Sequence, residues 1–382
     1  MRAKVLVIVY NLDRALEHEW YAQLMDRSKY DIHFALIRKG DGFLARFLEK
    51  EGIPVHRFAY AGKKDMPFLS WNIYKLIKRE QFKIVHAHLF EASIAGMVGA
   101  WMARTPIRIV TRHHSDFHHV NSRLAVILDR LVNKLATHIV AVSKNVQRIL
   151  VDWEAVESEK ITLIPHGIRL DSFGRNAVSA ERIDAIRSKL KIPLGFKVVG
   201  VVSRFIDWKG VQYIIPAFKM LLKAKPDTIL VLANAIGPYK EHILLLLKEL
   251  PESSYHLVDF EQDMPALYLN FDCFIHVPIA ATSEAFGQTY IEALASGIPS
   301  VVTISGVALE YAQNGVNCLV VPYKDFEAIN NAVCSIFDND IDVDRMVEQG
   351  IEVAERGYDY RKKYASLDKL YSDCLRYLEV KM

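Results

Sequence analysis

Short apolar runs alternate with longer amphipathic segments along the first half of the chain. The runs, rich in β-branched and aromatic residues, lie at 4–10, 31–37, 53–58, 83–86, 107–111 and 137–142. Apolar residues at three- and four-residue spacing predict helices between them, near 16–27, 43–51, 68–81, 91–103, 122–135 and 144–151. Such alternation is typical of parallel βαβ units, so the first half is expected to form an open α/β sheet.

The pattern stops and then restarts. A polar stretch with weak periodicity, about 170–195, precedes a second series of apolar runs at 197–203, 228–233, 255–258, 272–277, 299–303 and 317–321. We therefore expect two Rossmann-like domains, residues 1–175 and 176–357, that face each other across a ligand-binding cleft. The helical last stretch, 358–382, is long enough to cross back to the first domain.

Composition narrows the class of protein. Of the 382 residues, 51% are apolar and 24% are charged, which excludes a disordered or fibrous chain. The four cysteines form no CxxC pair and have no histidine at metal spacing, so reduced thiols in a cytoplasmic protein are expected. The six apolar residues before Asn11 are too few for a signal peptide, and no run approaches the ~18 apolar residues of a membrane span.

Charge is divided unevenly between the two halves. Residues 1–175 carry 27 Lys and Arg against 18 Asp and Glu, whereas residues 176–382 carry 21 against 27. The first half also holds 11 of the 14 histidines. We therefore expect it to meet an anionic partner, such as a phosphorylated acceptor or an acidic membrane surface. Nucleic acid is not expected, because aromatic residues are not interleaved with these charges in a recognisable module.

One segment of the second half combines a turn, a helix start and two acids. It runs from Ser283 to Pro299 and follows a buried apolar run. Gly287 would let a ligand approach the backbone, and the free N–H groups at the start of the following helix would attract an anion. Glu292 is placed to accept hydrogen bonds from a sugar diol, and Glu284 to contact a second sugar. A capped helix with two surface glutamates is the alternative interpretation.

A second segment, 203–210, supplies two cations. It follows the first apolar run of the second half and places Arg204 and Lys209 five residues apart across a loop. Two cations at the carboxyl end of a strand can neutralise a diphosphate leaving group. Isolated surface charges with no shared role are the alternative.

Together these segments resemble the retaining glycosyltransferases of sequence family 4. That family carries an arginine-to-lysine-glycine loop and, later, two glutamates separated by seven residues around Phe-Gly. Here the same features occur in the same order, about 75 residues apart. Further agreement comes from Ile164-Pro165-His166-Gly167-Ile168, Val140-Ala141-Val142-Ser143 and Thr111-Arg112-His113, so the resemblance covers nearly the whole chain. It implies the GT-B arrangement of two Rossmann-like domains, with a nucleoside diphosphate sugar donor held mainly by the second and an acceptor held by the first.

The resemblance also implies roles for individual residues. The catalytic set is His113, Arg204, Lys209 and Glu284, and the donor-binding set is Glu17, Arg204, Lys209, Glu284, Phe286, Gly287, Gln288 and Glu292. The two cations take the place of a metal ion, so no metal or other cofactor is expected. Four segments depart from the family. Arg14-Ala15-Leu16-Glu17 keeps the acid of a Gly-Gly-x-Glu loop but neither glycine, and His166 replaces the usual Asn before Gly167. The smaller changes are Ala285 in place of the glycine of Glu-Gly-Phe-Gly and Cys318 in place of the glycine of Asn-Gly.

Four histidines fall within seven residues of the first half. His114 and His118 can share a helix face and bind zinc with Asp116 nearby, but the segment lacks the glutamate of a metalloprotease helix and matches no zinc pattern. The resemblance instead puts His113 beside the transferred sugar. The acceptor-side candidates are then His114, Asp116, His118 and His119. Ordinary packing is the alternative for each histidine.

Two other features bear on the first half. His86 and His88, in His86-Ala87-His88, close the fourth predicted strand, and we expect them to face opposite sides of the sheet, so that at most one lines the cleft. The sequence 40–45 fits a dinucleotide fingerprint, but it follows the second predicted strand rather than the first and lacks the acidic residue at the next strand's end. A dehydrogenase is therefore disfavoured.

The segment 68–82 has two different faces. At 100° per residue its apolar residues, Leu69, Ile73, Leu76 and Ile77, fall on one side and would pack on the sheet, whereas Phe68, Trp71, Lys75, Lys78 and Arg79 fall on the other. Aromatic rings beside cations on an exposed helix face are typical of an interfacial anchor. We therefore expect peripheral contact with an anionic membrane and a sugar or lipid-linked acceptor. A solvated face with Trp71 packed on a loop is the alternative.

The sequence thus predicts a cytoplasmic retaining glycosyltransferase of cell-surface polysaccharide or glycolipid synthesis. A GT-B sugar-nucleotide epimerase or phosphorylase is the first alternative, and would turn over donor without an acceptor alcohol or depend on inorganic phosphate. A non-catalytic nucleotide-sugar-binding subunit is the second, and would bind donor without turnover.

Overall fold

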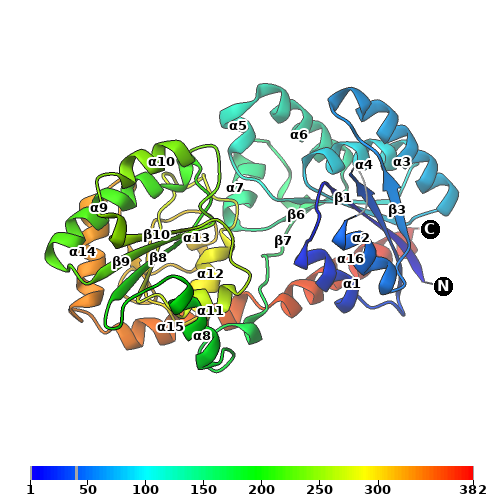
Figure 1. The fold of residues 1–382 in the computed structure, drawn as a ribbon. Helices are drawn as coiled ribbons and strands as arrows, with labels where there is room; N and C mark the ends of the chain where they lie inside the picture. The colour runs from blue at the N-terminus through cyan, green and yellow to red at the C-terminus, as the bar shows by residue number, and fades with distance from the viewer. Residues whose placement is uncertain (1, 39–41, 382) are drawn as a thin grey trace. The chain divides into compact units, whose positions relative to one another are not determined.

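The chain folds into two α/β units (Figure 1). The computed structural model describes residues 2–38 and 42–381, so the glycine fingerprint at 40–45 is only partly described. Met1–Pro165 and Tyr360–Met382 form the first unit, and His166–Asp359 forms the second. The first unit ends before the expected boundary at 175, because the chain joins the second unit earlier: the N–H of Ile168 donates to the carbonyl of Tyr358 at 2.8 Å.

The first unit is built on a seven-stranded parallel sheet. In sheet order its strands are β3 (Val55–Phe58), β2 (Tyr30–Ile37), β1 (Ala3–Tyr10), β4 (Ile84–His88), β5 (Ile107–Arg112), β6 (His138–Ala141) and β7 (Ile161–Leu163). Its helices are α1 (Leu16–Leu24), α2 (Phe43–Lys50), α3 (Met66–Glu80), α4 (Phe90–Met102), α5 (Phe117–Asn121), α6 (Arg123–Leu135) and α7 (Lys144–Asp152). The six predicted strands of this half are confirmed. No predicted run corresponds to β7, because three residues are too few to show a period.

The last helix, α16 (Tyr360–Lys381), completes the core of the first unit. Tyr364, Leu367 and Tyr371 are buried in the same apolar cluster as residues of β1 and β2. The hydroxyl of Tyr371 lies 2.7 Å from Nδ1 of His86 on β4 and 3.2 Å from the hydroxyl of Tyr21 on α1. The helix is therefore part of this unit's interior.

The second unit repeats the design with six parallel strands. In sheet order they are β10 (Tyr255–Val258), β9 (Thr228–Ala233), β8 (Lys197–Val202), β11 (Cys273–His276), β12 (Ser300–Val302) and β13 (Leu319–Val320). The helices are α8 (Ala180–Lys189), α9 (Val211–Ala224), α10 (Lys240–Leu247), α11 (Met264–Tyr268), α12 (Gln288–Ala295), α13 (Ala308–Tyr311), α14 (Phe326–Phe337) and α15 (Val343–Gly357). All six strands match predicted runs.

Two further findings bear on the predicted class of protein. Within residues 2–38 and 42–381, no helix combines the length and apolar character needed to cross a bilayer. The four cysteines are free thiols, and Cys273, Cys318 and Cys374 are buried, as the composition predicts.

Candidate functional site

The strand order reverses once in each sheet, and these reversals locate the candidate residues. In the first sheet the chain moves outward from β1 in one direction through β2 and β3 and in the other through β4 to β7. In the second sheet the corresponding reversal lies between β8 and β11. Ligands of open α/β sheets bind beyond the carboxyl ends of the strands at such a point. The predicted site residues lie in the segments that follow β8 and β11 in the second sheet and β1 and β5 in the first.

The loop after β8 carries the two predicted cations and is locked to the loop after β11. Gly210 has φ +78°, and a Cβ there would lie 1.9 Å from the carbonyl oxygen of Val277. The N–H of Ile279 donates to the carbonyl of Trp208 at 3.0 Å. Because only glycine tolerates that backbone conformation and that contact, Lys209 is held at a fixed place beside the second loop.

Lys209 and Glu284 form an ion pair across these two loops. Nζ of Lys209 lies 2.5 Å from Oε2 of Glu284, and Nε2 of His276 lies 3.3 Å from the same oxygen. Glu284 is only 7% exposed. Burial alone would raise the pKa of this carboxyl, but the charge of Lys209 and the hydrogen bond from His276 lower it to about 2. Glu284 is therefore a buried carboxylate that stays ionised at neutral pH.

His276 is a member of this cluster that the sequence does not single out. It is the last residue of β11 and is 1% exposed. Its ring packs edge-on against Tyr290 of α12, with centroids 4.5 Å apart. The sequence does show a histidine at the end of an otherwise apolar strand, which could have marked His276 as a site residue. Its contact with Glu284, however, depends on the fold of the loop between them.

The turn before α12 is shaped by a third loop, 303–307. The backbone N–H of Glu284 donates to Oγ of Ser305 at 3.1 Å, and the N–H of Val307 donates to the carbonyl of Phe286 at 2.8 Å. At Gly306, with φ +56°, a Cβ would lie 2.5 Å from that same carbonyl oxygen. The Phe-Gly turn is thus fixed by residues that sequence reasoning missed.

The helix start itself matches the prediction. Gly287, with φ +82°, is the residue before the first turn of α12, which begins at Gln288. Its left-handed conformation turns the chain into the helix, so the first backbone N–H groups of α12 are presented at the end of the Phe-Gly turn. This is the geometry that favours an anion.

Glu292 lies on α12 but is not a bare surface acid. Its Oε2 accepts a hydrogen bond from the hydroxyl of Tyr268 at 2.9 Å, and its Oε1 accepts one from Nε2 of Gln288 at 2.8 Å. Burial raises the pKa of Glu292 above its ordinary value. Tyr268 therefore orients the carboxylate. The alternative of a surface glutamate on a capped helix does not describe this half-buried, hydrogen-bonded side chain.

Arg204 differs from Lys209 in its surroundings. It is exposed, and within the part of the chain that the structure describes its guanidinium makes no ion pair. Lys209 also lies 4.6 Å from the centre of the Trp208 ring. One predicted cation is therefore preorganised by protein contacts, and the other extends into solvent.

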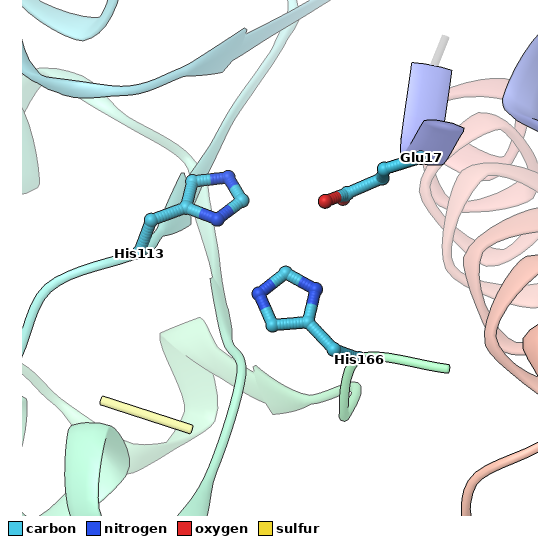
Figure 2. A group of neighbouring side chains, drawn as sticks. All are labelled: Glu17, His113 and His166. Carbon is cyan, nitrogen blue, oxygen red and sulfur yellow. The ribbon is translucent and has the colours of Figure 1, made fainter. Parts of the chain in front are cut away.

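In the first unit, Glu17 and His113 come together at the carboxyl edge of the sheet. Glu17 is on α1, after β1, and His113 directly follows β5; Figure 2 shows the carboxylate and the imidazole turned toward each other. A carboxylate oxygen and a ring nitrogen of this pair lie within 4.8 Å. Nζ of Lys363, on α16, hydrogen-bonds the Glu17 carboxylate. Burial lowers the pKa of His113 to about 4, so the imidazole is neutral at physiological pH.

His166, also labelled in Figure 2, is the first residue of the second unit. Within that unit its ring packs edge-on against Phe286, with centroids 5.2 Å apart. The residue that departs from the family pattern therefore contacts the Phe-Gly turn.

The expectation that His86 and His88 face opposite sides of the sheet is wrong. Their ring centroids lie 4.3 Å apart, because residues two apart in a strand share a face. His86 is held by Thr111 Oγ1 and the Tyr371 hydroxyl, each at 2.7 Å. Nδ1 of His88 lies 3.1 Å from Nε2 of His113, so His88 orients the predicted catalytic histidine.

The other histidines of the cluster surround a buried ion-pair network. Arg112 contacts Asp129 at 3.0 Å and Glu154 at 2.7 Å. His114 and His118 both contact Oδ2 of Asp129, at 3.1 and 2.6 Å, and His119 contacts Glu154 at 3.1 Å. Burial favours the neutral form of Asp129, but the hydrogen bonds from both histidines and the charge of Arg112 lower its pKa below the ordinary value. Through these contacts with Asp129 and Glu154, the three histidines stabilise the conformation of the loop after β5.

The acid beside the two histidines of the zinc alternative is not the one that the sequence predicts. Asp116 is the residue before α5, whereas Asp129 lies beside His114 and His118. The guanidinium of Arg112 is 3.0 Å from the Asp129 oxygen and 2.7 Å from Nε2 of His114. A guanidinium at that distance repels a metal cation, so the donor set of His114, His118 and Asp129 does not fit a metal ion.

Comparison with known proteins adds to this geometry. A family model described as glycosyl transferases group 1 matches residues 182–353, and one described as glycosyltransferase family 4 matches residues 21–172. The alpha-monoglucosyldiacylglycerol synthase of Streptococcus pneumoniae is 31% identical over 259 residues, which are 64% of this chain and 55% of that enzyme. The UDP-Gal:alpha-D-GlcNAc-diphosphoundecaprenol alpha-1,3-galactosyltransferase of Escherichia coli is 24% identical, over 92% of this chain and 91% of that enzyme.

Solved structures agree with the architecture. Anabaena Alr3699/HepE in complex with UDP-glucose matches 97% of this chain and 99% of its own, with a TM-score of 0.81 at 19% identity. The predicted class, an α/β protein with two Rossmann-like domains of the GT-B type, is confirmed. With each family model matched to one half in chain order, the chain belongs to the family 4 glycosyltransferases.

Proposed function

We propose that this protein is a retaining glycosyltransferase that moves a sugar from a nucleoside diphosphate sugar to an acceptor hydroxyl without a metal ion. One observation carries the proposal: a buried, ionised Glu284 is paired with Lys209 at 2.5 Å, next to the helix start after Gly287. This arrangement offers a carboxylate for sugar hydroxyls and positive charge for a diphosphate at one edge of one sheet.

Charge stabilisation of the leaving group is the main catalytic effect in this proposal. As the bond between the anomeric carbon and the phosphate oxygen breaks, negative charge grows on the diphosphate. Arg204, Lys209 and the first N–H groups of α12 would stabilise that charge, in place of a divalent cation. Since Lys209 is already held by Glu284, little reorganisation is needed when the charge appears.

Retention follows from attack on the face that the leaving group vacates. The acceptor oxygen bonds to the anomeric carbon on that face, and its proton passes to the departing phosphate oxygen. The neutral imidazole of His113 would hydrogen-bond a hydroxyl of the transferred sugar, with His88 and Glu17 as positioning residues. Glu292, oriented by Tyr268, would accept hydrogen bonds from the ribose.

We propose a uridine diphosphate sugar as the donor and a lipid-linked or sugar acceptor. The Anabaena structure is named for UDP-glucose and the Escherichia coli relative for a UDP-galactose donor and a diphosphoundecaprenol acceptor. The pneumococcal relative is named for a diacylglycerol product. A GT-B epimerase or phosphorylase has no comparable support.

We also propose that α3 holds the protein peripherally on an anionic membrane at the cytoplasmic face. The predicted division of this helix is confirmed: Leu69, Ile73, Leu76 and Ile77 are buried. Phe68 and Trp71 are 67% and 44% exposed, and Lys75, Lys78 and Arg79 are exposed beside them. Nζ of Lys75 lies 5.8 Å from the centre of the Trp71 ring.

The proposal is tested by donor binding and turnover with matched variants. A panel of nucleotide sugars is screened by thermal shift, since a ligand at 100 times its Kd stabilises by about 2.7 kcal/mol. Lys209→Ala should remove most of the shift for the preferred donor, whereas Lys219→Ala, which breaks a surface pair with Glu249, should leave it unchanged. Donor turnover that needs no acceptor alcohol would instead identify an epimerase or hydrolase, and binding without turnover a silent subunit.

A further inference from the structure

An apolar groove on the first unit has no role in the function described so far. It lies between α3, α4 and α6 and has a volume of about 640 Å³. Met66, Trp71, Ile94, Val98, Met102 and Leu128 are among the side chains that line it. A cavity of this size is in the range of a small-molecule site. Its walls are mostly hydrocarbon, so its ligand must be mostly hydrocarbon too.

The groove runs along α4 and begins at the carboxyl edge of the sheet. Its lining residues on α4 extend from Phe90, at the first turn, to Met102, at the last. This length of helix spans about 20 Å. The ring of Phe90 lies 4.4 Å from that of His118, so this end of the groove reaches the predicted acceptor-side histidines. A chain in the groove would have its head at that edge.

Polar groups line the groove at this end. Tyr60 is 8% exposed and packs edge-on against Tyr10, the last residue of β1, with ring centroids 5.7 Å apart. Across residues 2–38 and 42–381, no group hydrogen-bonds the buried Tyr60 hydroxyl. A buried hydroxyl without a partner is costly and points to a missing polar ligand. Lys63 and Glu91 also line the groove. Burial, and after it the charge of Glu91, raises the pKa of Tyr60.

The surface around the groove is apolar and basic. Phe68, Leu124 and Ile127 are 67%, 60% and 63% exposed, and Lys64 and Arg123 are exposed near them in the chain. Exposed apolar surface on this scale marks an interaction site. The cations complement an anionic headgroup rather than a second apolar protein face.

We propose that this groove binds the hydrocarbon chain of an anionic amphiphile that serves as the acceptor. The headgroup lies at the carboxyl edge, with its phosphate at Lys63 and the Tyr60 hydroxyl, and with any further hydroxyl at Glu91. The role of this amphiphile as the acceptor rests on the proposed function. Its binding in the groove does not, because binding requires no donor.

The test is a chain-length series measured by titration calorimetry. The probes are hexyl, octyl and decyl phosphate, used below the concentrations at which they form micelles, with inorganic phosphate as the headgroup alone. Each added methylene should tighten binding about fourfold, until the groove is full. Inorganic phosphate should not bind measurably. Tyr60→Phe should weaken binding severalfold without lowering the thermal midpoint, because its hydroxyl bonds no protein group.

A matched pair of variants assigns the binding to the groove. Leu128→Trp adds bulk to a groove-lining position, and Leu131→Trp makes the same change one turn further along α6, at an exposed position that does not line the groove. Only Leu128→Trp should abolish decyl phosphate binding. Both variants are checked by circular dichroism, and Val98→Phe provides a second filling change if Leu128→Trp does not fold.

Three results would overturn the proposal. Affinity that does not change with chain length would leave only an anion site. Undiminished binding by both Leu128→Trp and Val98→Phe would place the probe elsewhere. Sedimentation velocity could also show that the protein self-associates. If Leu128→Trp but not Leu131→Trp removed that association, the groove would be an interface between two copies. Nucleotide-sugar binding is measured in parallel, so that failure of the groove and failure of the proposed function are separately visible.

Discussion

Lys209 and Glu284 are 75 residues apart in the chain, yet Nζ and Oε2 lie 2.5 Å from each other. The two residues follow β8 and β11, which are neighbours at the reversal of the second sheet. A buried ion pair adds little net stability, because the desolvation of both charges opposes their attraction. Its position suggests that it is kept to orient a cation and a carboxylate for a ligand.

Removing either cation should reduce turnover in a protein that still folds. Lys209→Ala should also lower the thermal midpoint, because it leaves the buried Glu284 carboxylate without its ion-pair partner, whereas Arg204→Ala should not. Arg204→Ala or Lys209→Ala is expected to lower kcat by roughly a hundredfold or more, because each takes away charge that stabilises the departing diphosphate. Steady-state kinetics on protein checked by circular dichroism measure this. Lys219→Ala is the control on the same unit. Either variant with more than half of the native kcat would show that the leaving group is stabilised elsewhere.

The Glu284 carboxylate predicts a specific loss of stability in acid. Its pKa in the folded state, about 2, is below its ordinary value, so the stabilising contribution is complete above about pH 4.5 and is lost as the pH falls toward 2. Urea unfolding at pH 7 and pH 3 should therefore show a larger fall for the native protein than for Glu284→Gln. Glu249→Gln, at an exposed pair, should behave like the native protein. Equal falls in all three proteins would contradict the lowered pKa.

Chelators should not inhibit the enzyme. With Arg204 and Lys209 in place of a divalent cation, turnover in excess EDTA is expected to stay within about twofold of its value in buffer. The comparison includes readdition of magnesium, manganese and zinc, one at a time. An EDTA-inhibited enzyme that one of these ions restores would refute metal independence and direct attention back to His114, His118 and Asp129.

His113 should act as a neutral group. His113→Ala is expected to lower kcat by about a hundredfold, whereas His242→Ala, at an exposed position of α10, should not. Because burial lowers the pKa of His113 to about 4, its protonation should cause loss of activity only as the pH falls through that value. A native rate profile with an ionisation near 6.5 that disappears in His113→Ala would contradict this.

Membrane binding through α3 should depend on salt and on one helix face. The native chain is expected to co-sediment with vesicles that contain anionic lipid, less so at high salt, since each cation near the surface contributes about 1 kcal/mol. The triple variant Trp71→Ala, Lys75→Glu, Lys78→Glu should stay in the supernatant. The double variant Lys219→Glu, Lys223→Glu on α9 controls for net charge. Equal pelleting of the native and triple-variant proteins, or none by either, would favour a soluble acceptor.

The spacing of apolar residues predicts most helices and strands of this fold. It fails where a contact joins segments that are far apart in the chain. The helix expected at 68–81 is α3, Met66–Glu80, with the predicted residues buried, because an amphipathic pattern reports one local surface. Arg204, Lys209 and Glu284 also lie where spacing after strands predicts. His276 and Ser305 were missed, since their contacts with Glu284 join separate loops that no local pattern relates. The error at His86 and His88 was different: the strand period itself places them on one face.

The position of α16 has a consequence for the order in which the protein folds. The sheet of the first unit is made early in synthesis, but Tyr364, Leu367 and Tyr371, which fill its core, come from the last helix. The second unit, His166–Asp359, is continuous in the chain and contains its own core. On a ribosome, the later unit can therefore reach its native state before the earlier one. The first unit must wait for α16, which also brings Lys363 to Glu17.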